Sequence, residues 1–156
     1  MQGKNPSCSR TEQVQILMPE HINGYNRLFG GKLMEWIDVT AAVAARRHAG
    51  RNVTTAAVDN LCFKSAAYVD STVVLVGQVT YVGRTSMEVR VDSFVESLDG
   101  TRKMVNRAYL TMVALDENER PTPVPPLIPE TYEERQEYEA GERRAALRRQ
   151  RQAENF

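Results

Sequence analysis

The sequence predicts an α+β domain in which a five-stranded antiparallel sheet wraps around one long central helix. Two observations support this fold class. A single long apolar segment runs from Gly30 to Gly50, and between Leu33 and Ala45 it contains only Glu35 and Asp38 as charged residues. Several β-branched or alternating segments surround it without a second core helix, which excludes a strict α/β order. An antiparallel sheet around the helix is the economical packing.

The first elements are a short strand over 11–18 and the central helix itself. Apolar residues occupy nearly every face of the segment that begins at Gly30, which predicts a helix buried on all sides. Arg46 and Arg47 suit the negative end of the helix dipole, and Gly50 can end the helix. We therefore expect this helix to form the centre of the core.

Strand character returns after Gly50 in four separate segments, rich in β-branched residues or in strict alternation of apolar and polar positions. Gly83-Arg84 and Asp99-Gly100 stand between segments and are typical of hairpin turns. The four predicted strands are Val53–Phe63, Ser71–Val82, Thr85–Val95 and Lys103–Leu115.

The two ends of the chain differ in composition from the domain at 11–129. Residues 1–10 are polar, and we expect a disordered tail. Residues 119–129 hold five of the seven prolines, which predicts an extended exit segment. Residues 130–156 carry seven acids and six arginines. A solvated helix or tail is favoured there over a nucleic-acid site, because the acids cancel most of the positive field.

Length and charge exclude several classes of protein. The 156 residues suit one domain, and 20 basic and 20 acidic side chains cancel, whereas a general nucleic-acid binder needs a basic surplus. The apolar stretches are far shorter than the roughly 20 residues that span a bilayer. No apolar segment follows Met1, so we expect no signal peptide and a cytoplasmic protein with no nucleic-acid or membrane partner.

The cysteines and histidines are too few to form a metal site or a disulfide framework. Cys8 and Cys62 stand alone, and His21 and His48 are the two histidines. A zinc site of His and Cys ligands would lack ligands, so we expect no metal. Any catalysis must then depend on carboxylates, amides and backbone groups.

Four segments together resemble the hotdog fold, and specifically its acyl-CoA thioesterase family. They are N-G-Y-N-R-L-F-G-G-K-L-M-E-W-I-D at 23–38, T-T-A-A-V-D-N-L-C-F at 54–63, V-G-R-T-S-M-E-V at 82–89 and A-L-D-E-N-E-R-P-T-P-V-P-P-L at 114–127. The chain departs from the family pattern at a few positions. Asn26 stands where the family often has glycine, and Ala66, Asp70 and Ser71 stand where it usually has proline, glycine and aspartate.

Asp38 is the first catalytic candidate. An ionised carboxylate on an otherwise apolar helix is costly unless it is paired, and such groups are often functional. Its alternative is a structural role, as an exposed carboxylate or as a partner for Lys32 or Arg46. The resemblance implies that Asp38 is a general base that deprotonates a water molecule, and direct attack by the carboxylate stays open.

Asn23 and Gly31 complete the catalytic set. The resemblance implies that Asn23 works with the Asp of a facing subunit, against the alternative of an Asx turn. Gly30 and Gly31 let the backbone approach a ligand closely, and free N–H groups at the first helical turn can stabilise an oxyanion. By resemblance we assign that role to the N–H of Gly31, and the alternative is a tight turn before the helix.

Coenzyme A binding is expected at Gly30 and at the turn Gly83, Arg84, Thr85 and Ser86. Arg84 can pair with phosphate, while the hydroxyls and the backbone can bind the pantetheine arm. The alternative is a plain hairpin turn with a solvated arginine. No separate cofactor is expected, because coenzyme A is part of the substrate and of the product.

The resemblance implies a thioesterase that hydrolyses acyl-CoA to free CoA and a carboxylic acid. It also implies self-association, as at least a dimer and further as a trimer of dimers. Two alternatives are a hotdog dehydratase or hydratase and an acyl-CoA-sensing binding module. Many hotdog dehydratases use a histidine on or beside the helix, and a sensing regulator would need a DNA-binding segment.

Overall fold

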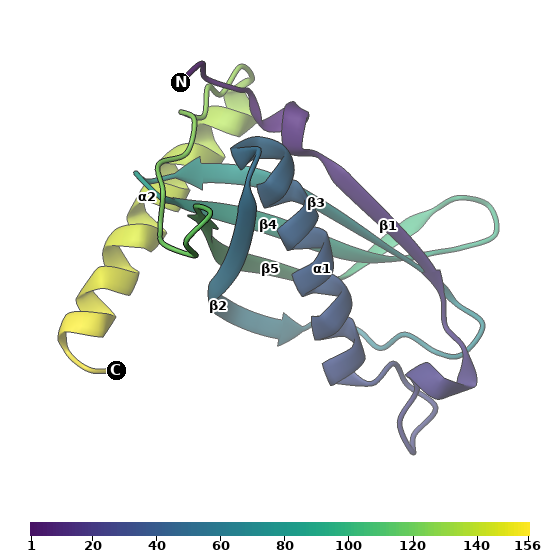
Figure 1. Cartoon of the computed structure of the whole chain (residues 1–156). Coiled ribbons are helices and arrows are strands. Elements are labelled where there is room, and N and C mark those ends of the chain that lie inside the picture. The colour runs from purple at the N-terminus through teal and green to yellow at the C-terminus, as the bar shows by residue number, and fades with distance from the viewer.

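The computed structural model describes the backbone of residues 1–156 and every side chain except that of Asn60. It confirms the α+β class, with five antiparallel strands in the order β1-β3-β4-β5-β2 curled around the long helix α1 (Figure 1). The strands are β1 Thr11–Ile16, β2 Asn52–Phe63, β3 Thr72–Val82, β4 Ser86–Glu96 and β5 Arg102–Leu115. The helices are the 3-10 turns η1 Pro6–Ser9 and η2 Pro19–His21, α1 Gly30–Ala49 and α2 Tyr132–Ala153.

Both predicted hairpin turns are present. The N–H of Gly83 donates to the carbonyl of Ser86 at 2.9 Å and closes the β3–β4 turn. Gly100 has φ +88° in the β4–β5 turn, a left-handed conformation that glycine adopts at little cost. Gly50 caps α1 in the same left-handed region, with φ +65°.

The core lies between α1 and the concave face of the sheet. Leu33, Ile37 and Ala41 of α1 are almost fully buried against strand residues such as Leu110 and Met112. Burial of a side chain as large as Leu33 or Ile37 contributes roughly 1.5–3 kcal/mol. Helix and sheet come so close at Gly77 that a Cβ there would lie 2.9 Å from the Thr40 methyl group.

The expectation that α1 is buried on all sides is wrong for the single chain. Met34 is 42 % exposed and Val39 is 50 % exposed, and Asp38 lies exposed between them. The reason is geometric, since the sheet curls around one side of α1 and leaves the other side uncovered (Figure 1). An exposed apolar stripe on a central helix is typical of an interface.

The first ten residues are ordered, contrary to the disordered tail that their composition predicts. Ser9 is fully buried, and its hydroxyl accepts from the N–H of Val79 at 2.9 Å. Lys4 exchanges two backbone hydrogen bonds with the proline-rich segment, one to Pro126 and one from Ile128. The extended segment therefore offers the polar N-terminal residues a backbone partner, which the composition does not reveal.

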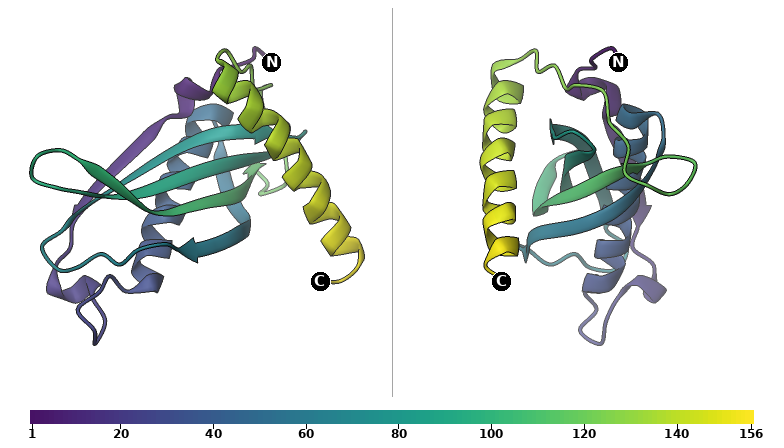
Figure 2. Two further views of the ribbon diagram at one scale, coloured as in Figure 1. Left: turned by 180° about the vertical axis from the view of Figure 1, so that it is seen from behind. Right: turned by 60° about the vertical axis from the view of Figure 1, so that its left-hand side comes forward.

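The C-terminal segment forms α2, which packs on the face of the sheet opposite to α1 rather than standing free in solvent (Figure 2). Thr131 and Glu134 form a capping box at its start. Gly141 and Ala145 are its buried residues. No helix in the described part of the chain is long and apolar enough to cross a membrane.

Ion pairs hold α2 on the sheet. Arg144 donates to both carboxylate oxygens of the fully buried Glu88 at 2.8 Å and to Glu137 at 2.6 Å. Burial alone would raise the pKa of Glu137, but the hydrogen bonds from Arg144 and Arg90 outweigh it, so the pKa is lowered. The charges of the segment are therefore paired with strand residues and not only with solvent.

Candidate active site

Asp38 lies on the uncovered side of α1, beside a mainly apolar cavity of about 360 Å³. The Thr55 hydroxyl on β2 donates to its Oδ1 at 2.6 Å, which is the length of a strong hydrogen bond to a carboxylate. The other oxygen, Oδ2, has no partner among the described residues. Met34, Val58 and Leu61 are among the apolar residues that form the walls. A carboxylate fixed in this way can accept a proton from a water molecule.

Two other charged groups lie near Asp38 but are already paired. Glu35 lines the same cavity and accepts from Lys32 at 2.8 Å. Of the two structural alternatives for Asp38, an ion pair with Lys32 or Arg46 does not occur within the described chain, where its partner is Thr55. The other alternative, an exposed carboxylate, agrees with the exposure of Asp38 in the single chain.

Gly31 lines the cavity of Asp38 at the first turn of α1. The carbonyl of Phe29 accepts from Lys32 and Leu33, and the N–H of Gly31 has no acceptor among the described residues. The helix dipole adds positive potential at this end. This backbone donor and the carboxylate of Asp38 therefore border one cavity.

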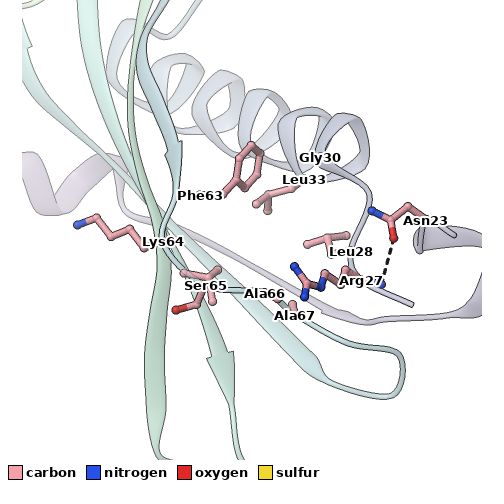
Figure 3. Close-up of a pocket in the computed structure, with 11 residues that line it drawn as sticks. Asn23, Arg27, Leu28, Gly30, Leu33, Phe63, Lys64, Ser65, Ala66 and Ala67 are labelled. Atoms are coloured by element: carbon pink, nitrogen blue, oxygen red, sulfur yellow. Dashed lines mark hydrogen bonds between the residues drawn. The ribbon is translucent and has the colours of Figure 1, made fainter. Parts of the chain in front are cut away.

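Asn23 lies in a different cavity of about 420 Å³, which Gly30, Leu33 and Phe63 also line (Figure 3). Its Oδ1 accepts from the N–H of Tyr25 at 2.9 Å and of Arg27 at 3.3 Å, which is the predicted alternative of an Asx turn. The turn holds the side chain in place and leaves its NH₂ group free to donate. Within one chain, Asn23 and Asp38 are not brought together.

Two departures from the family pattern have a structural explanation. Asn26 has φ +59° and Asp70 has φ +70°, so both adopt the left-handed conformation. Glycine adopts it freely, and Asn and Asp are the other residues that tolerate it best. The chain therefore keeps the backbone geometry at positions where the family often has glycine.

The turn predicted to bind coenzyme A borders a third cavity, also of about 420 Å³. Gly83 and Arg84 line it, together with the proline-rich segment and Tyr138 of α2. Thr85 and Ser86 belong to the turn but not to the cavity lining. The Arg84 side chain has no ion-pair partner in the described part of the chain, so its guanidinium is free to meet phosphate.

Sequence reasoning missed two residues of these cavities. Thr55 lies on the helix-facing side of β2, and alternation along that strand could have placed it opposite α1. Tyr138 lies in a segment that we expected to be solvated, so nothing in the sequence indicated its contact with Tyr81 at a ring-centroid distance of 5.0 Å.

No group of three His, Cys, Asp or Glu side chains that could hold a metal occurs among the described residues.

A family model of the thioesterase superfamily matches residues 25–99. The "Uncharacterized acyl-CoA thioester hydrolase YkhA" of Bacillus subtilis is 42 % identical over 127 residues, which make up 81 % of this chain and 74 % of that protein. Some relatives are much longer. The chain spans 24 % of the "Acyl-coenzyme A thioesterase 11" of Mus musculus, at 29 % identity over 142 residues.

Solved structures share the fold over nearly the whole chain. An apo-hexameric acyl-CoA thioesterase has a TM-score of 0.93 and 41 % identity, covering 98 % of this chain and 99 % of that one. An acyl-CoA hydrolase from Staphylococcus aureus, in complex with butyryl coenzyme A, coenzyme A and coenzyme A disulfide, has a TM-score of 0.92 and 33 % identity, covering 97 % and 93 %. Three mutants of it replace an Asn, an Asp and a Thr by alanine, at the same spacing as Asn23, Asp38 and Thr55.

Proposed function

The chain belongs to the thioesterase superfamily, and we propose that it hydrolyses acyl-CoA to free CoA and a carboxylic acid. The observation that carries this proposal is the cavity where Asp38, held by Thr55 at 2.6 Å, and the free N–H of Gly31 meet. Hydrolysis of a thioester needs a base for water and a donor for the developing oxyanion. One short stretch of α1 supplies both groups.

In the proposed reaction, Asp38 acts as the general base. Its Oδ2 accepts a proton from a water molecule as that water attacks the thioester carbonyl. The Thr55 hydroxyl keeps the carboxylate in one orientation, which holds the water in line with the carbonyl carbon. When the tetrahedral intermediate collapses, the C–S bond breaks, and the proton held by Asp38 passes to the leaving thiolate.

The oxyanion of the intermediate is stabilised by the N–H of Gly31 and by the positive end of the α1 dipole. A donor of this kind contributes about 3 kcal/mol to the transition state. A Cβ at this position would lie 2.8 Å from the Phe29 ring, so a larger residue would require that exposed side chain to move. The donor is part of the backbone and therefore needs no rearrangement during the reaction.

Asn23 completes the site from a second copy of the chain in our proposal. Its free NH₂ group can donate to the attacking water or to the substrate carbonyl. Two observations support pairing of two copies. The exposed side of α1 carries Met34 and Val39, and β2 is an edge strand whose outer side pairs with no strand among the described residues. Such an edge is a template for pairing with another strand.

We propose that two copies join their β2 edges into one continuous sheet and that three such dimers form the full assembly. The hexameric state of a similar thioesterase supports this arrangement. Coenzyme A would then bind at the Gly83–Ser86 turn, with Arg84 on phosphate and Gly30 close to the arm. The reaction needs water and no cofactor beyond the coenzyme A of the substrate. A cytoplasmic location agrees with Cys8 and Cys62, which are both unpaired.

The test is release of free thiol from purified protein with acyl-CoAs from acetyl to palmitoyl. The proposal fails if the folded protein turns over none of them. Asp38→Asn should lower kcat by at least about 100-fold, in the range that a lost general base costs, while the oligomer stays intact. Arg46→Met removes an exposed charge of the same helix outside the cavity lining, so it is the control and should keep most activity. A fully active Asp38→Asn variant would remove Asp38 from the mechanism.

A single turnover in H₂¹⁸O tests for direct attack by Asp38. With water as the nucleophile, the acid released in the first turnover carries ¹⁸O. With Asp38 as the nucleophile, water would open an anhydride and ¹⁸O would enter the enzyme carboxylate or the acid, depending on which carbonyl it attacks. Mass spectrometry of Asp38 after turnover detects label in the enzyme carboxylate, and a labelled Asp38 would refute the general base.

A further inference from the structure

β2 carries groups of different kinds on its two faces. Thr55, Val58 and Leu61 face α1 and line the cavity of Asp38. Asp59 pairs in register with Tyr109 of β5 and meets α2 on the opposite face of the sheet. A single strand therefore lies between the proposed active site and the C-terminal helix.

The contact between β2 and α2 is an ion pair that is largely shielded from solvent. Arg148 donates to Oδ2 of Asp59 at 2.9 Å, and Arg151 approaches Oδ1 at 3.4 Å. The Arg148 side chain is 14 % exposed and that of Asp59 is 13 % exposed. Salt and water screen such a pair much less than they screen a surface pair.

The pairing of β2 with β5 is irregular on both sides of this contact. Its ladder with β5 is irregular between Thr55 and Ala57 and again between Asp59 and Cys62. Ala57, Val58 and Asp59 are the residues in register between the two irregularities. The irregular pairing therefore leaves side-chain anchors to set the position of this short segment and of Thr55 next to it.

We propose that Asp59 and Arg148 are positioning residues for the hydrolysis reaction, through which α2 holds β2 so that Thr55 stays on Asp38. This inference rests on the proposed function and assigns α2 a part in it. Neither residue touches the reacting atoms. Loss of the pair lets the bulged segment move and lengthens the Thr55–Asp38 contact, which misdirects the carboxylate.

Steady-state kinetics with acyl-CoA test this proposal in the full-length protein. Asp59→Asn and Arg148→Met should each lower kcat about tenfold, the factor expected when a hydrogen bond to a charged group is weakened. KM should change less than twofold, because coenzyme A binds elsewhere. Arg148→Lys keeps the charge and should restore most of kcat. Arg149→Met removes an exposed arginine from the same helix and is the control.

Non-additivity shows whether the pair acts through Thr55. In the Thr55→Val background there is no hydroxyl to position, so adding Asp59→Asn should lower kcat no further. A further tenfold loss in that background would overturn the proposal. The proposal would also be overturned if Asp59→Asn kept the kcat of an active wild type. The same holds if the control Arg149→Met lost as much kcat as Arg148→Met.

Hydrogen exchange measures how firmly α2 holds β2 and does not depend on catalysis. In Arg148→Met, the amides of residues 52–63 should exchange faster while those of β3 and β4 stay unchanged. Equal protection of β2 in the variant and in the wild type would refute the proposal. If the wild type releases no thiol, the proposed function fails, and the exchange measurement still decides whether α2 holds β2.

Discussion

Replacing Arg144 by methionine is the sharpest test of how α2 is attached. The Glu88 carboxylate is fully buried and receives two hydrogen bonds of 2.8 Å from Arg144. After the replacement, its remaining partners are the Thr80 hydroxyl at 2.7 Å and Arg148 at 3.9 Å. Breaking a buried pair costs about 3–5 kcal/mol, and the two remaining partners place the loss near 3 kcal/mol.

Thermal unfolding at matched protomer concentration measures this loss, because oligomers melt in a concentration-dependent way. For a chain of this length, about 3 kcal/mol corresponds to a fall in Tm of roughly 6–12 °C. Arg149→Met removes an exposed arginine of the same helix and should change stability by less than about 0.5 kcal/mol. A loss below about 1 kcal/mol in Arg144→Met would show that the pair behaves as a surface salt bridge, which would refute the buried attachment.

Two further predictions concern packing and pH. Gly141→Ala should lower the Tm, because the new Cβ would lie 2.6 Å from the Cβ of Tyr81. This clash outweighs the helix propensity of alanine, which favours the substitution by about 1 kcal/mol. A higher Tm than that of the wild type would contradict the close contact, and Glu142→Ala is the control. Burial lowers the pKa of His48 below its ordinary value of 6.5, so the unfolded chain binds a proton first as the pH falls. The contribution of neutral His48 to stability is therefore fully present above about pH 6.5 and is lost as the pH falls below it. His48→Gln cannot titrate, so its free energy of unfolding in urea should change less between pH 7 and pH 5 than that of the wild type.

The order of the elements could be predicted because local patterns determine it. Alternation along β4, the caps of α1 and the two hairpin turns depend on neighbouring residues alone. The N-terminal residues could not be placed in this way. Ser9 and Lys4 find their partners in Val79 and Pro126, which are far away in sequence. Composition describes what a segment could do alone and not which backbone groups lie beside it.

The candidate site likewise contains some residues that local sequence patterns indicate and others that only the fold brings into place. Asp38 stands out as a carboxylate on an apolar helix, and Gly31 stands out as part of a double glycine before it. Thr55 has no such mark, because a threonine on a strand is ordinary until the strand is known to cross the helix at Asp38. The separation of Asn23 from Asp38 in one chain could be anticipated only through the family resemblance, which implies that the Asn works with the Asp of a facing subunit.

The two helices are attached to the same sheet by opposite means, and this explains the charge pattern of the chain. α1 is attached by apolar burial and carries its charged groups on its uncovered side. α2 has few apolar residues and is attached through Arg144 and Arg148, which meet acids on the outer face of the strands. The zero net charge of the sequence is therefore partly a sum of pairs formed across the fold. An acid such as Asp59 can then link the helix outside the sheet to the threonine inside it.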